Sequence, residues 1–160
     1  MGVECTNPQG FLDNLFARMQ EIIREEFIRA FSYLGEQCIR KVRDRPGDAS
    51  WFDQTGNLRS SIGYGVFEDG RKTIQSAFES VLKGAQGSAI GRKELDKLAG
   101  MYSDTFALVV IAGMEYADYV EAMNNKDVLA TTEIWARREM SRYVIMAITR
   151  AERRINKLII

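Results

Sequence analysis

The feature that most constrains the fold of this chain is a long amphipathic segment, residues 8–43. Apolar side chains recur there at intervals of three and four, which keeps them on one face of an α-helix. These positions are Leu12, Leu15, Phe16, Met19, Ile22, Ile23, Phe27, Ala30, Phe31, Leu34 and Cys38. Pro8 suits the first helical turn, and the breaker Pro46-Gly47 follows the segment. We therefore predict a single helix that is long for a globular domain.

The C-terminal half of this helix carries a second apolar arc, which consists of Ile28, Ile39 and Val42. A helix that is apolar on two sides is expected to be covered on two sides. The arc has no obvious partner within the chain, because the predicted C-terminal helix presents only one apolar stripe. We predict that the arc is buried against a neighbouring subunit or another protein, the alternative being cover by residues 83–104. The inner stripe, including Leu15, is expected to pack within the subunit.

Three segments carry the signals of β-structure. Residues 58–68 alternate between apolar and polar side chains, and an Asp-Gly turn separates them from residues 73–78, as in a β-hairpin. Residues 106–112 form a continuous apolar run of strand length. Such a run is typical of a strand buried on both faces. We therefore predict that 106–112 is a central strand.

The remaining segments complete the predicted fold. Residues 83–104 are rich in Gly, Ser and Lys, and we expect a mobile excursion between strands, with a short helix from Ser88 to Leu98. A second long helix is expected to start at Thr131 or Thr132, either of which can cap it, and to run to the C-terminus. The fold class is α+β: a long N-terminal helix, a small antiparallel sheet of three to four strands, and a C-terminal helix packed on the sheet.

Length and charge indicate one domain, residues 1–160, with no general affinity for polyanions. Lys and Arg together number 22, as do Asp and Glu, so the formal net charge is zero. This balance argues against a surface that as a whole attracts nucleic acid or anionic lipid, and it is compatible with self-assembly.

Cys5 and Cys38 are expected to lie too far apart for a disulfide if the first helix is straight. The N-terminus lacks a signal-peptide pattern, and no apolar run has the length of a membrane span.

The chain has no histidine, which removes the commonest general base and the commonest metal ligand. No phosphate-binding glycine loop or nucleophile elbow is present either. Acidic residues gather in one stretch, and they are Asp104, Glu115, Asp118, Glu121 and Asp127. Such a cluster is typical of a solvated face or half of an ionic interface rather than of a catalytic pair. We predict no enzymatic activity, no catalytic residue, no cofactor and no metal site.

The second long helix is strongly basic on one side. The bases that cluster there are Arg138, Arg142, Arg150, Arg153 and Lys157. A basic helical face can be solvated, can meet an acidic partner surface, or can contact the phosphates of DNA. The solvated face is the simplest of these interpretations, and the others stay open at this point.

Two short motifs carry a resemblance to a known family. Residues 55–62 read Thr-Gly-x-Leu-Arg-x-Ser-Ile, and residues 116–121 read Tyr-Ala-x-x-Val-Glu. Their order, between a long N-terminal helix and a C-terminal helix, resembles the neck and tail-completion proteins of siphophages. These are small proteins related to the minor tail protein Z of lambdoid phages. The chain departs from that family in its longer segment 83–104 and in Ala122-Met123 after the second motif.

The resemblance implies a structural virion protein of the phage head–tail junction or tail. Such a protein assembles into a ring-like homo-oligomer, with a hexamer as the expected form, and bridges neighbouring neck or tail proteins. It would be located in the virion after assembly in the bacterial cytoplasm, without a membrane, and any DNA contact would be non-specific. The alternative is a nucleic-acid-binding module that uses the basic face of the C-terminal helix.

We expect the motif residues to have structural roles. They are Thr55, Gly56, Leu58, Arg59, Ile62, Tyr116, Ala117, Val120 and Glu121. The Thr55 hydroxyl can cap a short turn, and Gly56 can adopt a backbone angle that a Cβ would forbid. The two aliphatic residues of the first motif would point into the core. Arg59 and Glu121 would pair, within the subunit or across a ring interface.

Overall fold

The computed structural model describes residues 2, 10–44, 51, 54–123 and 128–159, and it shows the predicted α+β fold. Within these residues the helices are α1 (Phe11–Arg43), α2 (Asn57–Ser60), α3 (Ala85–Asp96), α4 (Ala117–Ala122) and α5 (Ala130–Ile159). The strands are β1 (Ile62–Glu68), β2 (Arg71–Gln75) and β3 (Phe106–Ala112). Cys5, Pro8 and Asp127 lie outside the described residues.

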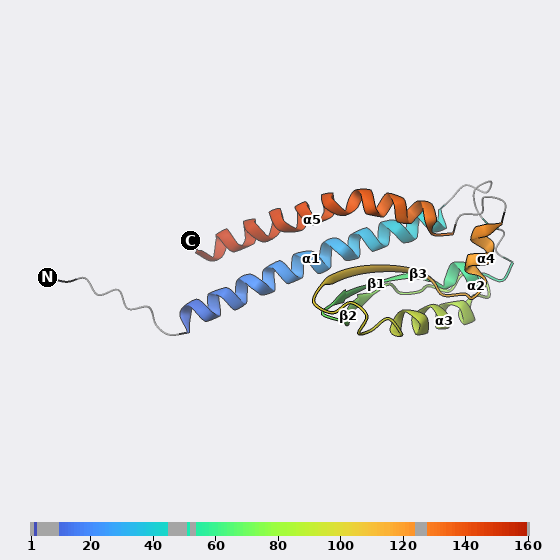
Figure 1. Ribbon diagram of the computed structural model, residues 1–160, viewed down its shortest axis with the longest axis horizontal. Coiled ribbons are helices and arrows are strands. Elements are labelled where there is room, and N and C mark those ends of the chain that lie inside the picture. Colours follow the sequence, from blue (N-terminus) through green and yellow to red (C-terminus); the bar gives the residue numbers. More distant parts are fainter. Residues whose placement is uncertain (1, 3–9, 45–50, 52–53, 124–127, 160) are drawn as a thin grey trace.

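The elements form layers, with α5 outermost, then α1, the sheet and α3 (Figure 1). The sheet is antiparallel in the order β2-β1-β3. One face of the sheet packs on α1, through a cluster that includes Phe31 and Tyr64. The opposite face packs on α3 through Phe67, Phe78 and Leu95. Helix α5 packs along α1 through Tyr143 and Ala147, and the same cluster includes Leu108 and Val110 of β3.

Ile39 and Val42 of the second apolar arc are buried inside the subunit and Ile28 is partly buried there, so the prediction that the arc faces another protein is wrong. Ile39 is 4% exposed and packs with Tyr64 and Val66 of β1, and Ile28 packs against the same cluster. Val42 is also buried, in a different cluster of the same chain. The sheet supplies the cover for Ile39, and the cluster that includes Leu58 and Ala117 supplies it for Val42. The alternative cover by residues 83–104 is wrong as well, because that segment lies on the other face of the sheet.

The continuous apolar run forms β3, which is at the edge of the sheet and not at its centre. The central strand is β1, which is buried along almost its whole length although its sequence alternates. Every residue of β3 is only partly buried. The prediction of a central strand at 106–112 therefore fails because an apolar run does not distinguish an edge strand beside two helices from a central one.

The hairpin forms with somewhat different boundaries from those predicted. Its turn is Asp69-Gly70, and both residues have positive φ (49° and 76°), as expected of the tight turn that suits two twisted strands. The segment 58–60 lies in the single-turn helix α2, so β1 begins only at Ile62. Strand β2 ends at Gln75, before Phe78.

The segment 83–104 is part of the core and not a detached excursion. Its helix, α3, begins at Ala85 and ends at Asp96, slightly earlier than predicted. Glycines allow it to lie close to the sheet: a Cβ at Gly91 would meet the carbonyl oxygen of Ser61 and the ring of Phe78. Leu95 on this helix is fully buried. This layer therefore closes the face of the sheet that α1 does not cover.

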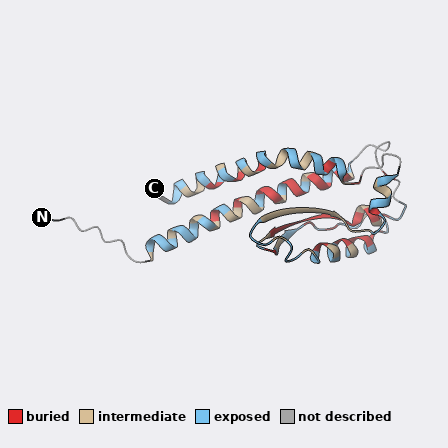
Figure 2. Ribbon diagram, viewed as in Figure 1, coloured by how far each residue is buried: buried red, intermediate tan, exposed pale blue. Residues whose placement is uncertain are grey.

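Helices α1 and α5 continue past the end of the sheet as a two-helix arm (Figure 1). The N-terminal part of α1 loses its apolar cover there: Phe11 is 60% exposed and Phe16 is 56% exposed. Leu15, which was expected to lie in the subunit core, is only partly buried. Figure 2 shows the same change along α1, from exposed residues at the arm to buried ones over the sheet.

Candidate assembly surfaces

The two motifs that carry the family resemblance meet in one apolar cluster, near the end of the molecule where α2 and α4 lie (Figure 1). Its buried members are Val42, Trp51, Leu58, Ile62, Ala117 and Val128. Val120 packs against this cluster, whereas Tyr116 at the start of the second motif is exposed. The structure thus brings together positions that are more than 50 residues apart in the sequence, and it confirms core roles for Leu58 and Ile62.

The start of the first motif is a turn in which both predicted roles are observed. The Thr55 hydroxyl accepts a hydrogen bond from the backbone N–H of Asn57 at 3.3 Å. Gly56 has a φ of +79°, in the left-handed region, and a Cβ there would collide with the carbonyl oxygen of Val81. Glycine is therefore required at position 56 both by the backbone angle and by the close approach of another chain segment.

Arg59 and Glu121 engage different partners within the subunit, so they do not pair there, and a pair across a ring interface stays a prediction. Arg59 donates a hydrogen bond to the carbonyl oxygen of Arg43, and its guanidinium lies 5.5 Å from the centre of the Trp51 ring. One oxygen of Glu121 accepts hydrogen bonds from the backbone N–H groups of Leu129 (3.1 Å) and Ala130 (2.6 Å). Glu121 therefore caps the N-terminus of α5, where the unsatisfied N–H groups and the helix dipole favour a negative charge.

A Glu121→Ala protein should lose about 1 kcal/mol of unfolding free energy, as expected when a helix cap is removed. Glu121→Gln is the matched control, because its amide oxygen can still accept both hydrogen bonds while the charge is lost. The Gln variant should fall between the Ala variant and the wild type in urea unfolding. Equal stability of the Ala variant and the wild type would show that the cap does not support α5.

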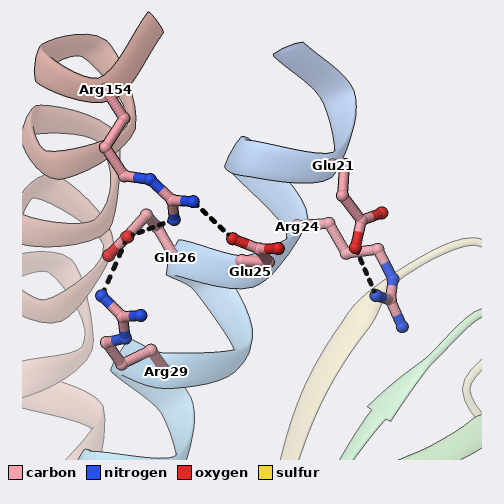
Figure 3. Close-up of polar contacts among 6 residues, drawn as sticks. All are labelled: Glu21, Arg24, Glu25, Glu26, Arg29 and Arg154. Atoms are coloured by element: carbon pink, nitrogen blue, oxygen red, sulfur yellow. Dashed lines mark hydrogen bonds and ion pairs between the residues drawn. The ribbon is translucent and has the colours of Figure 1, made fainter. Parts of the chain in front are cut away.

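A charged cluster joins α1 to α5 at the base of the arm (Figure 3). Arg154 of α5 pairs with Glu26 at 2.7 Å and with Glu25 at 2.6 Å. Arg29 also pairs with Glu26, whose side chain is only 1% exposed. The hydrogen bond from Arg154 lowers the pKa of Glu25. The buried Glu26 carboxylate pairs with an arginine from each helix, and this favours one alignment of α1 along α5.

The first candidate assembly surface is the apolar patch of the arm, formed by Phe11, Leu12, Phe16 and Ile23 of α1. All four side chains are exposed, although they are large and apolar. Contiguous exposed apolar surface on a soluble domain marks a site of interaction with another molecule. Sequence periodicity placed Leu12, Phe16 and Ile23 on the core stripe, because periodicity does not show where the sheet ends.

The second candidate surface is a groove of about 580 Å³ along β3. Helix α1 contributes Cys38 to it, and α5 contributes residues from Thr132 to Met140, with Leu129 just before that helix. Leu108 and Val109, from opposite faces of β3, both line it, so it follows the free edge of the strand. Burial raises the pKa of the Cys38 thiol to about 11, which makes a reactive thiolate at neutral pH unfavourable.

The backbone of β3 presents hydrogen-bonding groups to this groove. At the ends of the β1–β3 ladder, Gly113 donates to the carbonyl oxygen of Ser61 and Asp69 donates to that of Thr105. Because the bonds of an antiparallel ladder alternate, the N–H and C=O groups of Leu108 and Val110 point away from β1. An exposed strand edge of this kind can pair with a strand of another chain.

The described part of the chain has no group of three or more metal-binding side chains that could hold an ion. Among the acids considered in the sequence, Asp104, Glu115 and Asp118 are exposed. None of the helices in the described ranges combines the length and the apolar character that crossing a membrane requires.

Comparison with protein-family models, curated proteins and solved structures finds no match to this chain.

Proposed function

We propose that this chain is a structural protein of the head–tail junction or tail of a long-tailed bacteriophage. It would act by assembling with itself into a ring, with six copies as the expected number, and by bridging neighbouring virion proteins. The two sequence motifs support the proposal through their order along the chain. Their convergence in one cluster around Leu58, Ile62 and Ala117 fits the structural roles assigned to them.

The observation that carries the proposal is that each copy has two different apolar surfaces that stay accessible among the described residues. One is the apolar patch of the arm, and the other is the groove along the free edge of β3. Contacts between two different surfaces of identical subunits repeat head to tail, and they close into a ring when the rotation allows it. The groove offers partly buried apolar side chains such as Leu108 and Val110, which suit apolar side chains from the arm of a neighbouring copy.

A protein with Phe11→Ser and Phe16→Ser should assemble much less than the wild type at equal concentration. Both rings are mostly exposed in the subunit, so the melting temperature should remain close to that of the wild type. Mass photometry and negative-stain electron microscopy of the full chain would measure assembly, alone and with candidate neck proteins. Asn14→Ser, an exposed polar change in the same part of α1, is the control. A wild type that stays monomeric under all these conditions would count strongly against ring assembly.

A second candidate function is nucleic-acid binding by α5. The five bases of its basic face, named above, are all exposed. Binding of this kind should weaken steeply as salt is raised, because phosphate contacts release counterions. Fluorescence anisotropy with duplex and single-stranded DNA would test this function. Absence of binding at a salt concentration of about 50 mM would exclude it.

A further inference from the structure

Helix α5 carries an exposed stripe on the side that faces away from α1. Its positions are spaced alternately by four and three residues, and they are Ile134, Arg138, Ser141, Ile145, Ile148, Glu152 and Ile155. The first six are exposed, Ile145 to 62%, and Ile155 is partly buried. The side chains that face α1, such as Tyr143 and Ala147, form a separate buried stripe. Alternating spacings of three and four are the pattern of a seam between two packed helices.

The charges on this stripe are arranged symmetrically. Arg138 precedes Ile145 by seven residues, and Glu152 follows it by seven. Both charged side chains are exposed, and no ion pair joins either of them to another described residue. If two α5 helices pack antiparallel about this isoleucine, Arg138 of each copy comes close to Glu152 of the other. A parallel arrangement would instead bring the two arginines together, and likewise the two glutamates.

We propose that the α5 stripe is a contact between two copies of this chain, packed antiparallel. Ile145 and Ile148 of each copy would form its centre, and two Arg138–Glu152 pairs would flank that centre. The stripe from Ile134 to Ile155 extends about 30 Å along the helix, at about 1.5 Å per residue, which allows several layers of side chains. The charges favour a second copy of this chain as the partner. Two identical helices packed antiparallel about Ile145 place Arg138 of each copy beside Glu152 of the other.

The contact is independent of the proposed ring. A two-fold contact uses the same surface on both copies and closes as a dimer, whereas a ring requires two different surfaces. The Phe11 and Phe16 variants should therefore retain the dimer, and changes in the α5 stripe should leave the arm patch and the groove intact. Loss of one assembly can then be recognised in the presence of the other.

Charge reversals provide the decisive test, with sedimentation equilibrium on the full chain as the measurement. Arg138→Glu alone and Glu152→Arg alone should each raise the dimer dissociation constant at least tenfold, because each places like charges in contact. The protein with both changes should dimerise as the wild type does. An equimolar mixture of the two single variants should form a heterodimer, because both of its charge pairs are then complementary.

Two controls separate the contact from folding and from net charge. Ile145→Asp should abolish the dimer while circular dichroism shows an unchanged helical signal. Lys93→Glu, a reversal on the exposed surface of α3, should leave dimerisation unchanged. A wild type that remains monomeric at high micromolar concentration would overturn the proposal. A dimer that is insensitive to both single reversals, or that the double change fails to restore, would also overturn it.

Discussion

An Ile39→Asp protein is expected to be unfolded, or to have lost most of its unfolding free energy. The Ile39 side chain is buried between α1 and the sheet, among Phe31, Tyr64 and Val66. An aspartate there would have to bury a charge without a partner or become protonated, and either costs several kcal/mol. Domains of this size are stable by only about 5–15 kcal/mol, so one such change removes a large part of the total. Circular dichroism during heating would measure the loss.

Ile145→Asp is the matched control for this prediction, because it makes the same chemical change at an exposed position of a long helix. It should melt within a few degrees of the wild-type monomer. If Ile39→Asp folds as well as Ile145→Asp does, α1 does not pack on the sheet through this arc. The arc would then again be a candidate contact with another subunit, as its sequence suggested.

Local patterns were sufficient to predict the elements that depend on local physics. The spacing of apolar residues in α1 predicted a helix from 8 to 43, and the described helix spans Phe11–Arg43. The Asp-Gly pair predicted the β1–β2 turn, and Gly56 was assigned a special backbone angle that the structure contains. These features depend on a few neighbouring residues, whose identities are explicit in the sequence.

The partners of the elements could not be predicted in the same way. Periodicity shows that Ile39 and Val42 belong to a covered face, but both the sheet and a second subunit are adequate covers. The same ambiguity affects β3, whose apolar run fits an edge strand beside α1 and α5 as well as a central strand. Composition led to a wrong prediction for 83–104, because its glycines suggested a loose segment. Gly87 and Gly91 instead allow α3 to approach α2 and the carbonyl oxygen of Ser61 closely.

The charged contacts were the hardest features of the candidate site to predict. Glu121 reaches the start of α5 across the segment that separates α4 from α5, so no helical spacing relates it to Leu129 and Ala130. Glu26 is separated from Arg154 by 128 residues, and nothing in a charged helical sequence shows which carboxylate is buried. The Glu26–Arg154 contact follows from how α1 packs on α5, and the Glu121 contact follows from where α4 lies relative to the start of α5. The sequence alone leaves both arrangements undetermined.

An Arg154→Met protein should be less stable than the wild type, because the buried Glu26 carboxylate loses its charged partner on α5. Solvent screens part of this effect, since the Arg154 side chain is 34% exposed. Its guanidinium joins Glu26 and Glu25 of α1 to α5 (Figure 3). Without it, the buried Glu26 carboxylate keeps, among the described residues, only Arg29 of its own helix, and one of its oxygens has no hydrogen-bond partner among them. Urea unfolding of the monomer, at low protein concentration, would measure the loss.

The reason for this loss can be tested by removing the buried charge as well. Replacing a buried ion pair by apolar side chains of similar size is often neutral or stabilising, so Glu26→Leu with Arg154→Met should recover most of the lost stability. Such a recovery would show that Arg154→Met loses stability because the Glu26 carboxylate is left without its partner on α5, and not because the aliphatic part of the arginine no longer packs. If the double variant is as unstable as Arg154→Met alone, the arginine acts through its apolar contacts. The charged cluster would then not be what holds α5 against α1 at the base of the arm.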